Sequence, residues 1–140
     1  RTLAKKVSGF EPVAETRVAL VGARDLDLQE ADALAASRIR RIGPDLSGLD
    51  AVFPEASPVW LHVDLDVLDI AEGRANQFAT TGGLTVSQLV DAIRRLATRL
   101  SVVGAAFTAY DPAADDDDRV AAAALMVANA LAETQPRVRA

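Results

Sequence analysis

The feature that most constrains the fold is an alternation of apolar, strand-like runs with stretches of helical periodicity. The strand-like runs lie at residues 16–25, 58–69 and 101–112, and the helical stretches at 28–39, 84–100 and 115–133. A strand, a helix and a second strand in succession form the parallel βαβ unit. We therefore predict an α/β fold of three layers (α, β, α), in which helices cover both faces of a mostly parallel sheet. Ligands of such folds bind at the carboxyl ends of the strands.

Capping signals mark where two of the helices begin. Asp27 is a favoured N-cap for the helix expected over 28–39, and Gly43-Pro44 closes that unit. Thr85 and Gln88 have the spacing of a capping box. The apolar residues behind that box recur at helical spacing: Val86, Leu89, Val90, Ile93, Leu96 and Leu100.

Composition excludes several classes of function. The 140 residues are 50% hydrophobic, which suits one domain with one core. The formal net charge of -5 argues against a nucleic-acid partner, and there is no run of 18 apolar residues to suggest a membrane partner. The absence of cysteine excludes thiolate metal ligands and disulfides, and we expect a cytoplasmic protein.

Two aspartates in the central strand-like run carry the clearest chemical signal. In a regular strand Asp64 and Asp66 project to the same side, and His62 lies one step earlier on that side. Neighbouring ionised carboxylates repel each other, and burial is costly unless a cation compensates their charge. The pattern predicts a divalent metal site. The alternative is an edge strand whose polar face lies in water.

A second acidic run, from Asp115 to Asp118, precedes the last helical stretch. Four consecutive acids do not converge on one ion as the alternating ligands of a calcium loop do. They stand where the helix dipole favours negative charge, so we interpret the run as a solvated helix cap.

The segment around the aspartate pair also matches a known pattern. The chain reads DLDVLDI, then the eleven-residue loop AEGRANQFATT, then GGLT. This resembles the arginase, agmatinase and formiminoglutamase (ureohydrolase) family, in which DxDxxDP is followed by a loop of fixed length and GGLT. The resemblance extends from VALVGARDLDLQE through VVGAAFTAYDP to the final helix. It implies that residues 1–140 are the C-terminal portion of a single arginase-like α/β domain, and that the domain is incomplete in this chain.

The resemblance implies a metal-dependent reaction. Asp64 and Asp66 match the two aspartates with which the family binds its paired Mn²⁺ ions, and Asp69 matches the third aspartate of the motif. The metal pair of the family activates a hydroxide that attacks a guanidinium or related carbon. The implied function is hydrolysis of a non-peptide C–N bond in a guanidino, formimino or amide substrate.

The family's other metal ligands, a histidine of a GGDH-type turn and a DAHxD cluster, have no counterpart here. His62 is the only histidine of the chain, so only the DxD half of the metal site is present. We expect the 140 residues alone to be inactive, and the full-length protein to act on a small-molecule substrate. We also expect either association with the missing N-terminal half or a homo-oligomer, because an isolated half exposes sheet edges and apolar helix faces.

Substrate contacts are less defined. Asn76 lies in the part of the loop that contacts substrate in the family, and Ala109 stands where the family has its guanidinium-binding glutamate. Tyr110 and Asp111 follow, either as substrate ligands or as turn residues. His62 either orients a metal ligand through a carboxylate or has no role. The alternative to a hydrolase is a catalytically silent arginase-like protein that acts in assembly or oligomerisation.

Overall fold

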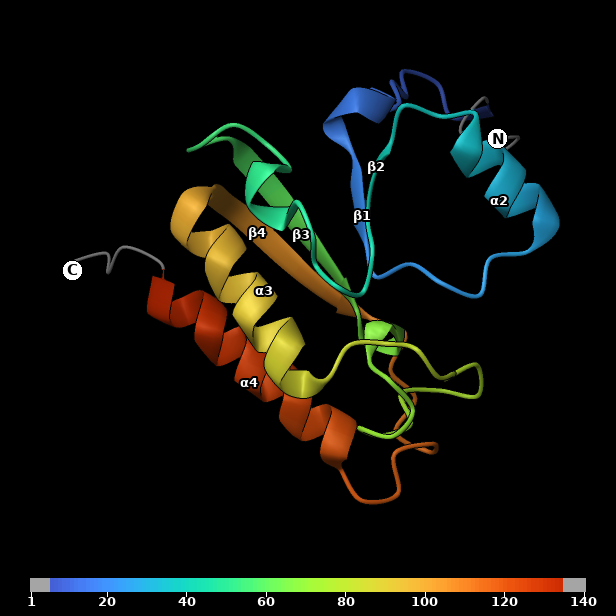
Figure 1. Ribbon diagram of the computed structural model, residues 1–140, viewed down its shortest axis with the longest axis vertical. Coiled ribbons are helices and arrows are strands. Elements are labelled where there is room, and N and C mark those ends of the chain that lie inside the picture. The colour runs from blue at the N-terminus through green and yellow to red at the C-terminus, as the bar shows by residue number, and fades with distance from the viewer. Residues whose placement is uncertain (1–5, 135–140) are drawn as a thin grey trace.

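The computed structural model describes residues 6–134 and confirms the α/β alternation (Figure 1). The strands are β1 (Ala19–Val21), β2 (Arg40–Ile42), β3 (Pro58–Asp64) and β4 (Ser101–Thr108), and the helices are α2 (Leu28–Ala35), α3 (Val86–Arg99) and α4 (Arg119–Thr134). Short 3-10 helices are η1 (Glu15–Arg17), η2 (Leu49–Ala51) and η3 (Leu65–Val67). Within the described residues no helix has the length and apolar character that crossing a membrane requires.

The strands form two parallel pairs. β1 pairs with β2, and β3 pairs with β4 from Pro58 opposite Ser101 to Asp64 opposite Thr108. Each pair is connected through a helix, which makes two βαβ units, β1-α2-β2 and β3-α3-β4. The predicted parallel pairing is confirmed. Within residues 6–134 the two parallel pairs form separate two-stranded sheets.

Several predicted boundaries were wrong, among them the end of the strand expected over 101–112, which lies at Thr108. The helix expected over 28–39 ends at Ala35, and Arg40–Ile42 forms β2 because its backbone pairs with β1. The strand expected over 58–69 ends at Asp64, where the chain turns into η3. At β2 the pairing with a distant strand decides the conformation, whereas at Asp64 a local bond from the Asp66 N–H turns the chain.

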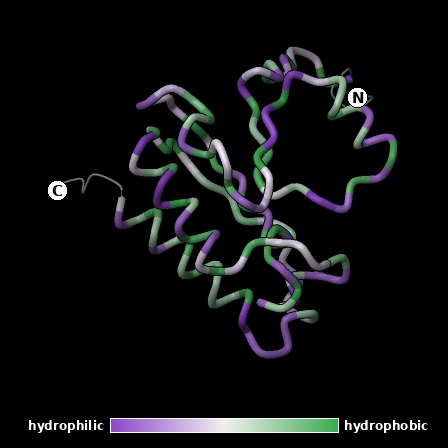
Figure 2. The backbone as a smooth tube through the Cα atoms, viewed as in Figure 1, coloured by the Kyte–Doolittle hydropathy of each residue, from purple (hydrophilic) through white to green (hydrophobic). Residues whose placement is uncertain are grey.

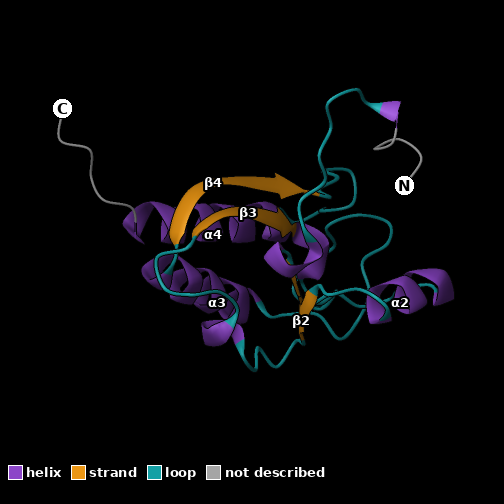
Figure 3. Ribbon diagram, turned by 90° about the horizontal axis from the view of Figure 1, so that it is seen from above, coloured by secondary structure: helices purple, strands orange, loops and turns teal. Residues whose placement is uncertain are grey.

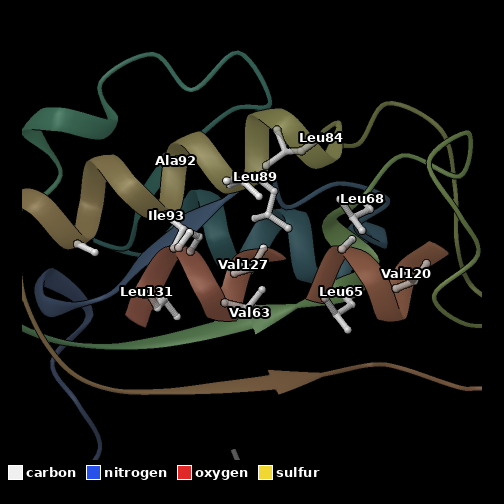
Figure 4. Packing of buried hydrophobic residues seen from close by; sticks show 14 of the residues in the cluster. Val63, Leu65, Leu68, Leu84, Leu89, Ala92, Ile93, Val120, Val127 and Leu131 are labelled. Atoms are coloured by element: carbon white, nitrogen blue, oxygen red, sulfur yellow. The ribbon is translucent and has the colours of Figure 1, made fainter. Parts of the chain in front are cut away.

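The core lies between α3, α4 and one face of the β3–β4 pair (Figures 3 and 4). Along α3 and α4 hydrophobic and hydrophilic residues alternate, as in helices with one buried face (Figure 2). Leu89, Val90 and Ile93 of the predicted stripe are buried. The capping box is confirmed, because Thr85 Oγ1 accepts the Gln88 N–H at 3.1 Å and Gln88 Oε1 accepts the Thr85 N–H at 2.8 Å.

The opposite face of β3 is open in the described chain. Trp60, His62 and Asp64 are exposed, and they alternate with side chains on the core side. The Trp60 ring is 64% exposed and lies over Gly104 of β4, where an added Cβ would come within 2.3 Å of the ring. Glycine at 104 therefore allows a large aromatic side chain to lie flat on this face.

Candidate metal centre at the end of strand β3

The turn that follows β3 positions the two aspartates. Asp64 is the N-cap of η3, and its Oδ1 accepts the Asp66 N–H at 3.0 Å. Leu65 and Leu68, each only 2% exposed, fix the turn in the core. The position of Asp66 is therefore set by this turn, and the alternation of a regular strand no longer applies to it.

The two carboxylates differ in their surroundings. Asp64 is exposed, whereas Asp66 is half-buried, with an Oδ1 atom that is shielded from solvent. That oxygen has no hydrogen-bond partner within residues 6–134. A shielded carboxylate oxygen without a donor is unfavourable, and a cation is one group that removes the penalty. Carboxylate oxygens are ligands that suit Mn²⁺, so the donor set fits the predicted ion as far as it goes.

The donor set is nevertheless incomplete. Across the part of the chain that the structure describes, no three histidine, cysteine, aspartate or glutamate side chains gather closely enough to hold a metal ion. Two carboxylates are what this segment offers, and an ion held here would need ligands from elsewhere. The assignment of Asp64 and Asp66 as ligands stays a prediction.

His62 contacts a hydroxyl. Its Nε2 lies 2.8 Å from Thr108 Oγ1, across the β3–β4 pair, and the ring is exposed. The sequence left open whether the ring orients a ligand through a carboxylate or has no role. In the described residues its hydrogen-bond partner is Thr108, the last residue of β4, and not a carboxylate.

Asp69 closes the loop at residues 70–81. Its Oδ1 accepts the Ala71 N–H at 2.9 Å, and its Oδ2 accepts the N–H groups of Gly82 at 2.7 Å and Gly83 at 3.2 Å. The bond from Ala71, followed by the bond from Gly82, holds the pKa of Asp69 below its ordinary value. Since these backbone donors engage both oxygens, the observed role of Asp69 is to shape the loop.

Asn76 ties the same loop to the end of β4. Its Oδ1 accepts the Phe78 N–H at 2.7 Å, and its Nδ2 donates to the Ala109 carbonyl at 2.8 Å. Asp111, just beyond, accepts the Ala113 N–H through Oδ1 at 2.9 Å. These contacts are those of turn and loop residues, and the predicted substrate contacts of Asn76 and Asp111 stay predictions.

Tyr110 donates its hydroxyl to Asp115 Oδ2 at 3.2 Å, at the start of α4. Asp115 is only 4% exposed, and it also accepts the N–H groups of Val120 and Ala121. Burial opposes ionisation of Asp115, but the backbone donors outweigh it and hold its pKa below the ordinary value. Burial, and then the bond to Asp115, raise the pKa of Tyr110. The predicted helix cap is present, although Asp115 is not solvated as expected.

No role was assigned from the sequence to Arg24, which lies near the end of the strand-like run at 16–25. The guanidinium donates to the carbonyls of Leu68 at 2.9 Å, Thr80 at 3.0 Å and Thr81 at 3.2 Å. An arginine shortly after the carboxyl end of an apolar strand-like run, where ligands bind in such folds, was the available signal.

Comparison with known proteins follows the same elements. The family model described as Arginase family matches residues 5–133. An agmatinase of Bacillus anthracis is 35% identical over 82 residues, which are 56% of this chain and 28% of the agmatinase. An agmatinase of Bacillus cereus is 34% identical over 82 residues, with the same two shares.

Solved structures share the fold. The arginase of Bacillus caldovelox superposes with a TM-score of 0.78 at 22% identity, over 96% of this chain and 48% of that one. The formimidoylglutamase of Bacillus subtilis gives a TM-score of 0.73 at 19% identity, over 86% of this chain and 42% of that one. The chain thus spans less than half of the length of these relatives.

Proposed function

This chain belongs to the arginase family, and we propose that it supplies the Asp64–Asp66 half of a metal site that hydrolyses a non-peptide C–N bond. The observation that carries the proposal is the shielded Asp66 Oδ1 without a partner, beside a second carboxylate in the same turn. When bound, Mn²⁺ would supply Lewis-acid activation of a water molecule. Asp64 and Asp66 would hold the ion, while η3 fixes the spacing between them.

The substrate is proposed to be a small guanidino, formimino or amide compound. The agmatinase, arginase and formimidoylglutamase that resemble this chain support that range by their names. Ala109, at the end of β4, carries no carboxylate to pair with a guanidinium cation. We therefore expect an assay to need formimino and amide compounds as well as guanidino compounds.

The remaining ligands are proposed to come from another part of an arginase-family domain. The described part of this chain offers two carboxylates to the metal site, and the chain spans 48% of the arginase on which it superposes. The exposed apolar side chains of β3 and β4 support contact with further protein, because Trp60 is 64%, Val103 65% and Phe107 37% exposed.

The decisive experiment is Mn²⁺ binding by the protein at its full natural length, followed by thermal unfolding and by hydrolysis of the three substrate classes. Asp64→Asn and Asp66→Asn should each weaken Mn²⁺ binding by more than the roughly 10- to 100-fold that loss of an outer-sphere partner causes. Both variants should lose hydrolysis. Asp32→Asn, the same change on exposed α2, is the matched control and should bind as the parent does. An unchanged metal response in both test variants contradicts the proposal.

The second candidate is a catalytically silent member of the family that acts in assembly. The absence of a third ligand in residues 6–134 and the presence of Ala109 favour it. It predicts that the full-length protein shows no Mn²⁺-dependent stabilisation but sediments as a stable oligomer. Metal-dependent stabilisation that requires Asp66 rejects this candidate.

A further inference from the structure

Arg24 joins the two βαβ units. β1 and β3 do not pair with each other, so no strand ladder connects the units in the described residues. Within residues 6–134, every hydrogen bond between segment 6–43 and segment 58–134 comes from the Arg24 side chain. Apolar packing also connects the units, because Gly22 lies against Val67 and Leu84, and Val21 and Ile42 pack against the core.

The acceptors of Arg24 lie at both ends of one loop. Leu68 lies just before the loop at residues 70–81, and Thr80 and Thr81 are the last two residues of that loop. A guanidinium presents five N–H donors in a rigid plane, so one side chain can bridge several carbonyls. A lysine ammonium is a compact charge with a different geometry and would not reproduce the bridge.

Asp69 also holds the two ends of the loop together, but as a hydrogen-bond acceptor where Arg24 is a donor. Arg24 donates to carbonyls at the two loop ends, while Asp69 accepts from the amides of Ala71, Gly82 and Gly83. The loop ends are thus held by one cation and one anion through backbone groups. Charge-assisted hydrogen bonds of this kind are about twice as strong as neutral ones.

The same closure fixes the turn that carries Asp66. Leu68, which accepts from Arg24, follows η3 directly and donates its N–H to Leu65 at 3.3 Å. The Leu84 N–H donates to Val67 at 2.9 Å, so the residue after Gly83 also holds this turn. Arg24 is therefore connected to the turn through one backbone carbonyl, two residues beyond Asp66.

We propose that Arg24 is a positioning residue that couples the β1-α2-β2 unit to the Asp66 turn and so sets the affinity of the candidate metal centre. This inference rests on the proposed function. Because backbone carbonyls engage its Nε and Nη2, Arg24 acts on the turn through Leu68 and the loop.

The first test reads the loop alone by amide hydrogen exchange in the full-length protein without metal. Arg24→Met should speed exchange at Ala71, Gly82 and Gly83 by about tenfold, because local opening loses charge-assisted bonds. Amides of α3 and α4 should keep their rates. Arg41→Met, at an exposed arginine of β2, is the matched control and should leave the loop amides unchanged. Unchanged loop exchange, or equal acceleration everywhere, overturns the coupling.

The second test reads the metal centre. Arg24→Met should weaken Mn²⁺ binding by roughly 10- to 100-fold, the effect of losing an outer-sphere partner, and Arg24→Lys should recover part of it. Parent-like Mn²⁺ affinity in a variant whose loop amides exchange faster overturns the positioning role. If the parent itself binds no Mn²⁺, the proposed function fails and the positioning role fails with it, while the exchange result still decides the coupling.

Discussion

The turns that follow β3 and β4 lie at the same end of a parallel pair, and each holds a shielded carboxylate. After β4, Asp115 accepts from the N–H groups of Val120 and Ala121 and from the Tyr110 hydroxyl. After β3, Asp66 keeps one shielded oxygen without any partner in the described residues.

The difference teaches which carboxylate is structural and which is available to a ligand. Asp115 lies at the start of a 16-residue helix, whose free N–H groups and dipole stabilise an anion. Asp66 lies in a 3-residue turn, which offers no such set of donors. The sequence shows an aspartate in each turn but not its surroundings. Asp115 has backbone donors, whereas Asp66 has a shielded oxygen without one, so only Asp66 predicts a bound cation.

The largest effect is expected for Asp115→Ala. The change leaves the Val120 and Ala121 N–H groups and the Tyr110 hydroxyl without their acceptor. We expect the free energy of unfolding to fall by about 2 kcal/mol, as for the loss of a strong helix cap. Urea unfolding measures it. Asp116→Ala, next to it and exposed, is the control and should stay within about 0.5 kcal/mol of the parent. Equal effects at both positions would remove the contrast between the two turns.

A smaller effect of opposite sign is expected for Asp66→Asn in the metal-free, full-length protein. Asparagine keeps the size of the side chain and removes the negative charge from the group whose Oδ1 is shielded without a donor, so we expect stability to rise, by at most about 1 kcal/mol. Mn²⁺ should abolish the advantage, because only the parent gains binding energy. Asp32→Asn serves as the control. A loss of stability without metal would show that Asp66 already has a partner in the complete protein.

Local signals in the sequence predicted what local forces decide. Thr85 and Gln88 predicted the start of α3 because a capping box closes within four residues. The apolar residues of α3 predicted its buried face because their helical spacing places them on one side of the helix. The DxD pattern and the Gly82-Gly83 pair predicted the family, but the turn after β3 was not predicted, because the same residues alternate as in a strand.

What the sequence did not predict depends on partners far along the chain. β2 forms because Arg40–Ile42 pairs with β1, although its residues extend a helical stretch. Asp115 is buried because Tyr110 and α4 enclose it, which four consecutive acids do not reveal. Arg24 reaches acceptors 44 to 57 residues away, so only the fold shows its contacts.

The smallest effect concerns the first residue of the turn after β4. Ala109 has a φ of 60°, in the left-handed region that favours glycine. Ala109→Gly should relieve this strain and raise stability by roughly 0.5 kcal/mol, because the unfolded chain also gains freedom and offsets part of the gain. The measurement is the urea midpoint at constant slope.

The matched control for this change is Ala106→Gly, three residues earlier in regular β4. Glycine inside a strand should lower stability by roughly 0.5–1 kcal/mol, so the two variants should shift the midpoint in opposite directions. The Ala109 carbonyl, which accepts from Asn76, is retained in the variant, so the loop connection is not altered. A loss of stability at 109 as large as at 106 would mean that the turn after β4 is not strained, and that a side chain at 109 has a packing role.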